Sequence, residues 1–318
     1  MNKLLTAVLI VAMPGSAFAQ QAYPEKLIRI MTANAPGGST SILARMIGDK
    51  FTERWGQPTI VDNRPGGNGF IGGDALAKSV PDGYNLILVT ATHVITPLLA
   101  PAPYDTIKDF AAVGTVTSSE QLMVVNPSVP ASNLKEFVAY AKSKPGQLNF
   151  PTTGSGGIQH IFGEMFALQT NVKIQAVPYK GGAPALTDLL GGQVQFAIQS
   201  PFVIIPQVKS GKLRAIAVTG KTRLGSLPDT PTFAEAGLPS FDVNNWYGIL
   251  APAGTPKPIV DKLSAEIARI LTLPDVNKTI LQQGMDPFST TPEQFAALIK
   301  SDIGKYAKVI KSANIKIE

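Results

Sequence analysis

Short apolar runs alternate with amphipathic stretches along most of this chain, and loops of small polar residues join them. The first run, Leu27 to Met31, is followed by the loop Ala33 to Ser41. After the loop, apolar residues return at the spacing of one helix face: Ile42, Leu43, Met46, Ile47 and Phe51. This change of period predicts a buried strand, a loop and a helix.

The same order recurs through the chain and predicts an α/β protein. Further strands are expected at 59–62, 85–90, 174–177, 194–198, 213–219 and 246–251, and helices at 134–144, 158–168, 259–271 and 292–311. Ala111 to Val116 and Gln121 to Val125 are interpreted as two strands separated by Thr117-Ser118-Ser119. A second lobe is expected to begin there. Ser132-Asn133 is expected to cap the helix that follows.

The loop before the first helix is a candidate anion site. Gly37 and Gly38 would let a ligand approach the backbone closely. Ser39, Thr40 and Ser41 suit a helix start, where free N–H groups and the helix dipole attract an anion. The alternative is an ordinary strand-to-helix loop with a good N-cap.

A second small-residue loop, Thr153, Gly154, Ser155 and Gly156, repeats this arrangement in the second half of the chain. Two such loops in two lobes would hold one anion between them. A hydrolase based on Ser155 and His160 is the alternative for this loop. The nucleophile motif G-x-S-x-G requires glycine where Thr153 stands, and the sequence places no acid to complete a triad.

Two further candidates follow predicted strands. Thr92 and His93 come after the strand at 85–90, and Gln199 and Ser200 come after the strand at 194–198. Ligands of open α/β sheets bind at the carboxyl ends of strands. For His93, a partly buried histidine at a helix start is the open alternative. No catalytic residue, cofactor or metal site is predicted.

The composition indicates an exported protein. Lys3, the apolar stretch Leu4 to Met13 and Ala17-Phe18-Ala19 form a signal peptide, with cleavage expected between Ala19 and Gln20 and a periplasmic mature protein. The chain has no cysteine, which excludes disulfides and thiol chemistry. Its net charge of +6 is dispersed, so no nucleic-acid partner is expected.

A series of short motifs resembles a known family. In chain order the motifs are Ala35-Pro36-Gly37-Gly38 with Ala44-Arg45, Asp62-Asn63-Arg64-Pro65-Gly66-Gly67 with Pro81-Asp82-Gly83-Tyr84, Gly154-Ser155-Gly156 with His160, Val177-Pro178-Tyr179-Lys180-Gly181, Gly211-Lys212-Leu213-Arg214-Ala215, Leu227-Pro228-Asp229-Thr230-Pro231-Thr232 with Glu235-Ala236-Gly237, and Ala251-Pro252-Ala253-Gly254-Thr255-Pro256. Their joint order resembles the extracytoplasmic solute-binding receptors of tripartite tricarboxylate transporters, the Bug family. The resemblance covers the mature chain.

The resemblance implies a two-lobed periplasmic-binding-protein fold of type II character, with a mixed sheet flanked by helices in each lobe and two crossings at the hinge. Residues 20–118 and 247–318 would form lobe 1, and residues 119–246 lobe 2. The implied function is capture of a small organic carboxylate between the lobes and its delivery to membrane transporter subunits, by a monomer. A ligand-sensing partner of a membrane sensor kinase would share this fold, and an exported esterase is the enzymatic alternative.

Ser41 departs from the family pattern, in which many relatives have Asp. Loss of that carboxylate predicts a ligand without an ammonium group, namely a mono- or dicarboxylate, aliphatic or aromatic. Tyr179, Trp246 and Phe202 are candidates for an aromatic wall, with a core or hinge position as the alternative for each.

Overall fold

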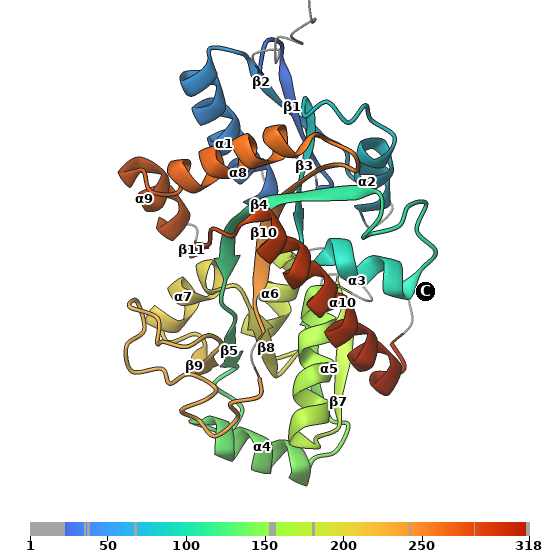
Figure 1. Ribbon diagram of the computed structural model, residues 1–318. Coiled ribbons are helices and arrows are strands. Elements are labelled where there is room, and N and C mark those ends of the chain that lie inside the picture. Colours follow the sequence, from blue (N-terminus) through green and yellow to red (C-terminus); the bar gives the residue numbers. More distant parts are fainter. Residues whose placement is uncertain are drawn as a thin grey trace, which may run out of the picture.

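The computed structural model describes residues 23–34, 36, 39–66, 69–152, 157–179, 182–241, 243–282 and 284–315. The predicted signal peptide therefore lies outside the described residues. The chain forms two lobes joined by long strands that run between them (Figure 1). Lobe 1 is the part built on a six-stranded sheet, and lobe 2 is the part built on two smaller sheets. The two-lobed α/β fold predicted from the sequence is confirmed.

The sheet of lobe 1 has the strand order β11-β4-β10-β3-β1-β2. The parallel strands are β1 (Ile28–Thr32), β2 (Thr59–Asn63) and β3 (Asn85–Thr90). β10 (Asn245–Pro252) runs antiparallel to both β3 and β4 (Phe110–Ser119), and β11 (Asp286–Pro287) completes the other edge.

Helices cover both faces of this sheet, which explains the continuous apolar run of β3. Leu86 and Leu88 pack with α1 (Ser39–Trp55) and α8 (Lys257–Ile270), near α9 (Pro274–Gln282). Ile87 and Val89 pack on the other face with α2 (Phe70–Ala77), α3 (Thr92–Leu99) and α10 (Pro292–Ala313).

Lobe 2 holds an antiparallel sheet of β8 (Phe196–Gln199), β5 (Leu122–Val125) and β9 (Arg214–Val218). A parallel pair, β6 (Leu148–Thr152) and β7 (Ile174–Pro178), lies beside it and is linked by the hydrogen bond from Gln195 N to Asn149 O. Its helices are α4 (Leu134–Ser143), α5 (Ile158–Thr170), α6 (Gly182–Leu190) and α7 (Pro201–Lys209). The predicted cap of α4 is confirmed, since the Asn133 side chain accepts a hydrogen bond from Glu136 N.

One strand prediction was wrong. The sequence placed a break at Thr117-Ser118-Ser119, but β4 continues without interruption to Ser119. The reason is tertiary: β10 pairs with this segment up to the register Asn245↔Ser119. Polar residues that resemble a loop therefore form one of the strands that join the lobes.

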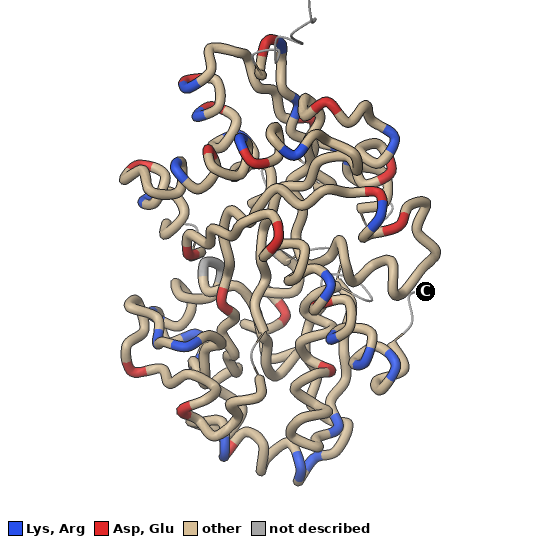
Figure 2. Tube along the Cα trace, in the orientation of Figure 1, with Lys and Arg blue, Asp and Glu red and all other residues tan. Residues whose placement is uncertain are grey.

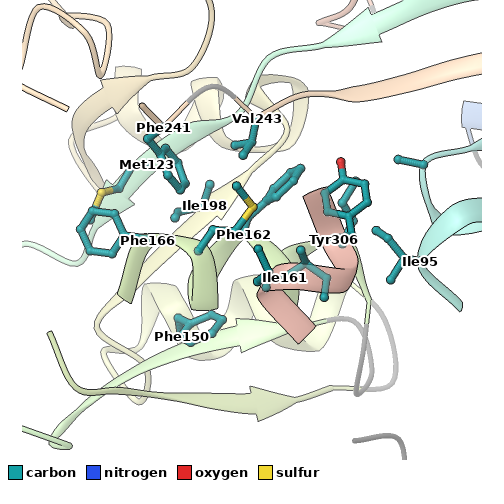
Figure 3. Packing of buried hydrophobic residues seen from close by; sticks show 14 of the residues in the cluster. Ile95, Met123, Phe150, Ile161, Phe162, Phe166, Ile198, Phe241, Val243 and Tyr306 are labelled. Carbon is teal, nitrogen blue, oxygen red and sulfur yellow. The ribbon is translucent and has the colours of Figure 1, made fainter. Parts of the chain in front are cut away.

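A shared apolar core connects the lobes through α10. In Figure 1, this helix runs from lobe 1 down beside α5, so it packs on more than the first lobe. Figure 3 shows Tyr306 of α10 between Ile95 of lobe 1 and the lobe 2 residues Ile161 and Phe162. Trp246 is fully buried and donates from Nε1 to Asp302 Oδ2 at 2.7 Å. Trp246 is therefore a core residue, which is the alternative to an aromatic wall that the sequence left open.

Charged side chains are spread over both lobes, with basic and acidic residues interspersed (Figure 2). None of the helices in the described part of the chain has the length and apolar character that a membrane span requires.

Candidate functional site

The first turn of α1 contains three of the predicted ligand residues, and they differ in what their side chains do. Thr40 and Ser41 are almost completely buried. Thr40 Oγ1 accepts from Asn34 Nδ2 at 3.1 Å, and Ser41 Oγ donates to Asn63 Oδ1 at 3.4 Å. Ser39 is half-buried and faces the hydroxyl of Tyr247 on β10. Gly37 and Gly38 lie outside the described residues.

Tyr247 brings a residue of the crossing strand to the start of α1. Burial raises the pKa of Tyr247, against the opposing effect of hydrogen bonds from Ser39 and Asn245. Its hydroxyl therefore stays protonated at neutral pH and remains a hydrogen-bond donor. Asn245 Nδ2 lies 3.4 Å from that hydroxyl, while Asn245 Oδ1 is buried and has no hydrogen-bond partner among the described residues. Residues 245 and 247 share one face of β10 because side chains alternate along a strand.

A second chain of contacts reaches lobe 2. Ser119, at the end of β4, lies opposite Asn245 in the ladder. Its Oγ is 3.3 Å from Oγ of Ser200, which precedes α7. Gln199 is the last residue of β8 and is buried. Neutral polar side chains therefore lie along the crossing strands from Ser39 of lobe 1 to Ser200 of lobe 2, with backbone pairing between Asn245 and Ser119 in the middle.

Glu120, the acidic residue next to Ser119, forms its side-chain contacts within lobe 2. Glu120 follows Ser119 and accepts a hydrogen bond from Thr219 Oγ1 at 2.8 Å. It packs so closely on Gly220 that a Cβ atom there would lie 2.4 Å from the Glu120 carboxyl carbon. Gly220, at φ +94°, leaves the space that this carboxylate needs.

The predicted loop 153–156 lies outside the described residues, but both of its ends are described. Thr152 ends β6, and Gly157 is the N-cap of α5. A strand therefore precedes the segment 153–156 and a helix follows it, as predicted. Thr152 is buried, and its Oγ1 has no hydrogen-bond partner in the described part of the chain.

The structure places Thr92 and His93 at the start of α3. Thr92 is half-buried, and its N–H donates to Thr90 Oγ1 at 3.3 Å. His93 is 8% exposed and stacks on Tyr104, with Phe110 edge-on. Burial lowers the pKa of His93 to about 4, so the imidazole is neutral at neutral pH. His93 therefore offers no positive charge to an anion, and its ring contacts match the partly buried alternative.

Two of the remaining residues singled out in the sequence, Tyr179 and His160, contact residues close to them along the chain. Tyr179 donates its hydroxyl to Asp188 Oδ2 at 2.8 Å, and the Phe202 side chain lies outside the described part. His160 is 3.8 Å from Glu164; burial lowers the pKa of the histidine and raises that of the carboxyl group. Among the described residues, no three His, Asp or Glu side chains gather as metal ligands would.

Sequence reasoning missed Ser119, Asn245, Tyr247 and Asn63. The alternation of Asn245 and Tyr247 with the core residues Trp246 and Gly248 is a signal that would have found two of them.

Comparisons with known proteins agree on one family. The model of the "Tripartite tricarboxylate transporter family receptor" matches residues 43–315. Protein BugT of Bordetella pertussis is 33% identical over 324 residues, covering 100% of this chain and 99% of BugT. The R. palustris protein Rpa4515, solved with adipate, is 32% identical with a TM-score of 0.80, over 93% of this chain and 100% of that one.

MatC from Rhodopseudomonas palustris, solved with bound malate, is 30% identical with a TM-score of 0.76, over 91% of this chain and 100% of that one. These relatives confirm the resemblance found in the motifs and the expectation of a solute-binding receptor rather than an enzyme. With the family model matched over most of the two lobes, this chain belongs to the tripartite tricarboxylate transporter family of receptors.

Proposed function

We propose that this chain is a periplasmic receptor that binds a small mono- or dicarboxylate between its lobes and delivers it to a tripartite tricarboxylate transporter. The observation that carries this proposal is the polar junction at the crossing strands. Ser39, Tyr247, Asn245, Ser119 and Ser200 form a neutral set of donors and acceptors that spans both lobes. Similarity to receptors solved with adipate and malate supports a carboxylate as the ligand.

Neutral donors are sufficient to hold a carboxylate. Hydrogen bonds to a charged group are stronger than neutral ones, and a site with little water strengthens them further. The start of α1 adds free N–H groups and the positive end of the helix dipole. We place Gly37, Gly38, Ser39, Thr92, Gln199, Ser200 and the loop Thr153, Gly154, Ser155, Gly156 around the ligand. Closure of the lobes would complete this shell.

The structure changes the role proposed for Ser41. Its buried hydroxyl faces Asn63, so direct contact with a ligand does not form part of the proposal. We retain the expectation of a ligand without an ammonium group, because no carboxylate stands at position 41 to pair with one. The mature protein would begin at Gln20 and act as a monomer.

Thermal unfolding of the mature protein against adipate, malate, aromatic carboxylates and amino acids tests the proposal. A ligand at 100 times its Kd adds about 2.7 kcal/mol of stability. We expect stabilisation by at least one carboxylate and by no amino acid. Ser155→Ala should weaken binding by about 1 kcal/mol or more, as for a lost hydrogen bond to a charged group. Ser143→Ala, at an exposed serine that ends α4 in the same lobe, is the matched control. A panel without any stabilising carboxylate would contradict the proposal.

A further inference from the structure

Asn63 lies at the end of β2, beside the end of β1 and the start of α1. Its Nδ2 donates to Thr32 Oγ1 at 2.6 Å and to the carbonyl oxygen of Asn34 at 3.1 Å. Its Oδ1 accepts from Ser41 Oγ at 3.4 Å. One amide side chain thus contacts the last residue of β1, the loop that follows it and the first turn of α1.

Other hydrogen bonds tighten the same segment. Asn34 Nδ2 donates to Thr40 Oγ1 at 3.1 Å, and Thr32 Oγ1 lies 3.3 Å from the Asn34 carbonyl oxygen. Thr32, Thr40 and Ser41 are each at most 3% exposed. Because water has little access to these hydroxyl groups, loss of one partner would leave a buried donor or acceptor unsatisfied.

The end of β2 is itself anchored. Arg64 N donates to the carbonyl oxygen of Thr32 at 2.8 Å. Asp62 Oδ2 accepts from Arg29 Nη1 at 3.0 Å and from Arg64 Nε at 2.9 Å. The position of Asn63 relative to β1 therefore depends on backbone pairing and ion pairs that lie outside the loop, so Asn63 is a fixed point against which the loop is held.

We infer that Asn63 is a positioning residue that holds Asn34 and the first turn of α1 in the geometry that the ligand meets. Asn63 belongs to the Asp62–Gly67 motif. None of the proposed ligand contacts comes from this motif, so the inference assigns it a role. The consequence for binding rests on the proposed function, because that function places the carboxylate at the start of α1. A loop held in its bound geometry before the ligand arrives loses less entropy on binding.

Hydrogen–deuterium exchange of the ligand-free protein tests the positioning role directly. In Asn63→Ala, amide exchange in the segment 34–44 should be about tenfold faster or more, since each lost hydrogen bond contributes about 1 kcal/mol and 1.4 kcal/mol is a factor of ten. Exchange in the rest of lobe 1 should be unchanged. Thr59→Val is the matched control on the same strand, because Thr59 Oγ1 is buried and has no hydrogen-bond partner to lose within the described ranges. Unchanged exchange in segment 34–44, or equally faster exchange throughout lobe 1, would overturn the inference.

Affinity provides the second readout, with adipate and malate as probes. Asn63→Ala should raise the Kd of any probe that stabilises the wild type at least tenfold, whereas Thr59→Val should not change it. A purely structural Asn63 would lower the unfolding temperature without changing the Kd of the folded protein, and that result would contradict the inference. If neither probe nor any other carboxylate binds the wild type, the proposed function fails, and the exchange experiment alone decides the role of Asn63.

Discussion

The two small-residue loops look alike in the sequence, but the strands that lead into them end differently. β1 ends in Thr32, whose hydroxyl accepts a hydrogen bond from Asn63 at 2.6 Å. β6 ends in Thr152, whose equally buried hydroxyl has no hydrogen-bond partner among the described residues. At the start of α1, Thr40 bonds to Asn34 and Ser41 bonds to Asn63.

The shared local pattern therefore does not imply the same hydrogen-bond partner for the threonine that ends the strand. In lobe 1, the side chains of three elements hold the approach to the helix, so the backbone geometry exists before any ligand is present. Under the proposed function, lobe 1 presents this held approach to the ligand.

The largest expected effect concerns the two histidines, one in each lobe. The pKa of His93 is about 4 in the folded protein and about 6.5 in an unfolded chain. Between these pH values, His93 binds a proton in the unfolded chain but not in the folded protein. The free energy of unfolding therefore falls as the pH falls from about 6.5 to 4. The loss is about 3 kcal/mol, at 1.36 kcal/mol per pKa unit. Chemical denaturation at pH 7 and pH 4 measures it.

The matched variants identify the histidine responsible. His93→Gln should remove most of this loss, because it leaves no imidazole to protonate. His160→Gln should retain most of it, since His160 is only partly buried. Equal pH dependence in the wild type and in His93→Gln would show that the aromatic pocket of lobe 1 does not exclude the proton.

A smaller effect is expected from the same substitution at the two strand ends. Thr32→Val should lower the free energy of unfolding by about 2 kcal/mol, because Asn63 Nδ2 loses its shortest hydrogen bond in a buried setting. Thr152→Val should leave it unchanged or raise it slightly, because the Thr152 hydroxyl has no partner among the residues that the structure describes. Urea titration of both variants measures the contrast. Equal losses of stability at the two positions would contradict the difference between the two strand ends.

The smallest effect is expected at the crossing strand. Tyr247→Phe removes the hydroxyl that faces Ser39 and Asn245. We expect about a fivefold increase in the Kd of a bound carboxylate, equivalent to about 1 kcal/mol, with little change in stability. Calorimetric titration beside Ser200→Ala compares the two ends of the polar junction. An unchanged Kd in Tyr247→Phe would remove this hydroxyl from the proposed site.

Much of the local structure followed from the sequence because it depends on neighbours along the chain. The apolar run at 85–90 predicted β3 with its observed bounds, and Asn133 marked the start of α4. Strand-to-helix loops were predicted by glycine, serine and threonine at the helix starts, and the strands and helices that flank both segments occur where expected. The family emerged from the order of the motifs, and the comparisons confirm it.

Predictions that depended on distant partners were less successful. β4 extends through Ser119 because β10 pairs with it. No local feature of Thr117-Ser118-Ser119 indicates this pairing. Trp246 is a core residue because Asp302 and Phe295 of α10 meet it. His93 has a lowered pKa because Tyr104 and Phe110 surround it.

The α/β alternation, the cap of α4 and the family followed from the sequence alone, since periodicity, capping residues and motif order can all be recognised along the chain. Tertiary structure alone decided that Asn63 meets Thr32 and that Ser39 meets Tyr247. These contacts join residues 31 and more than 200 positions apart. They exist only because the sheet sets β2 beside β1 and carries β10 across the hinge, and strand order is a property of the whole fold.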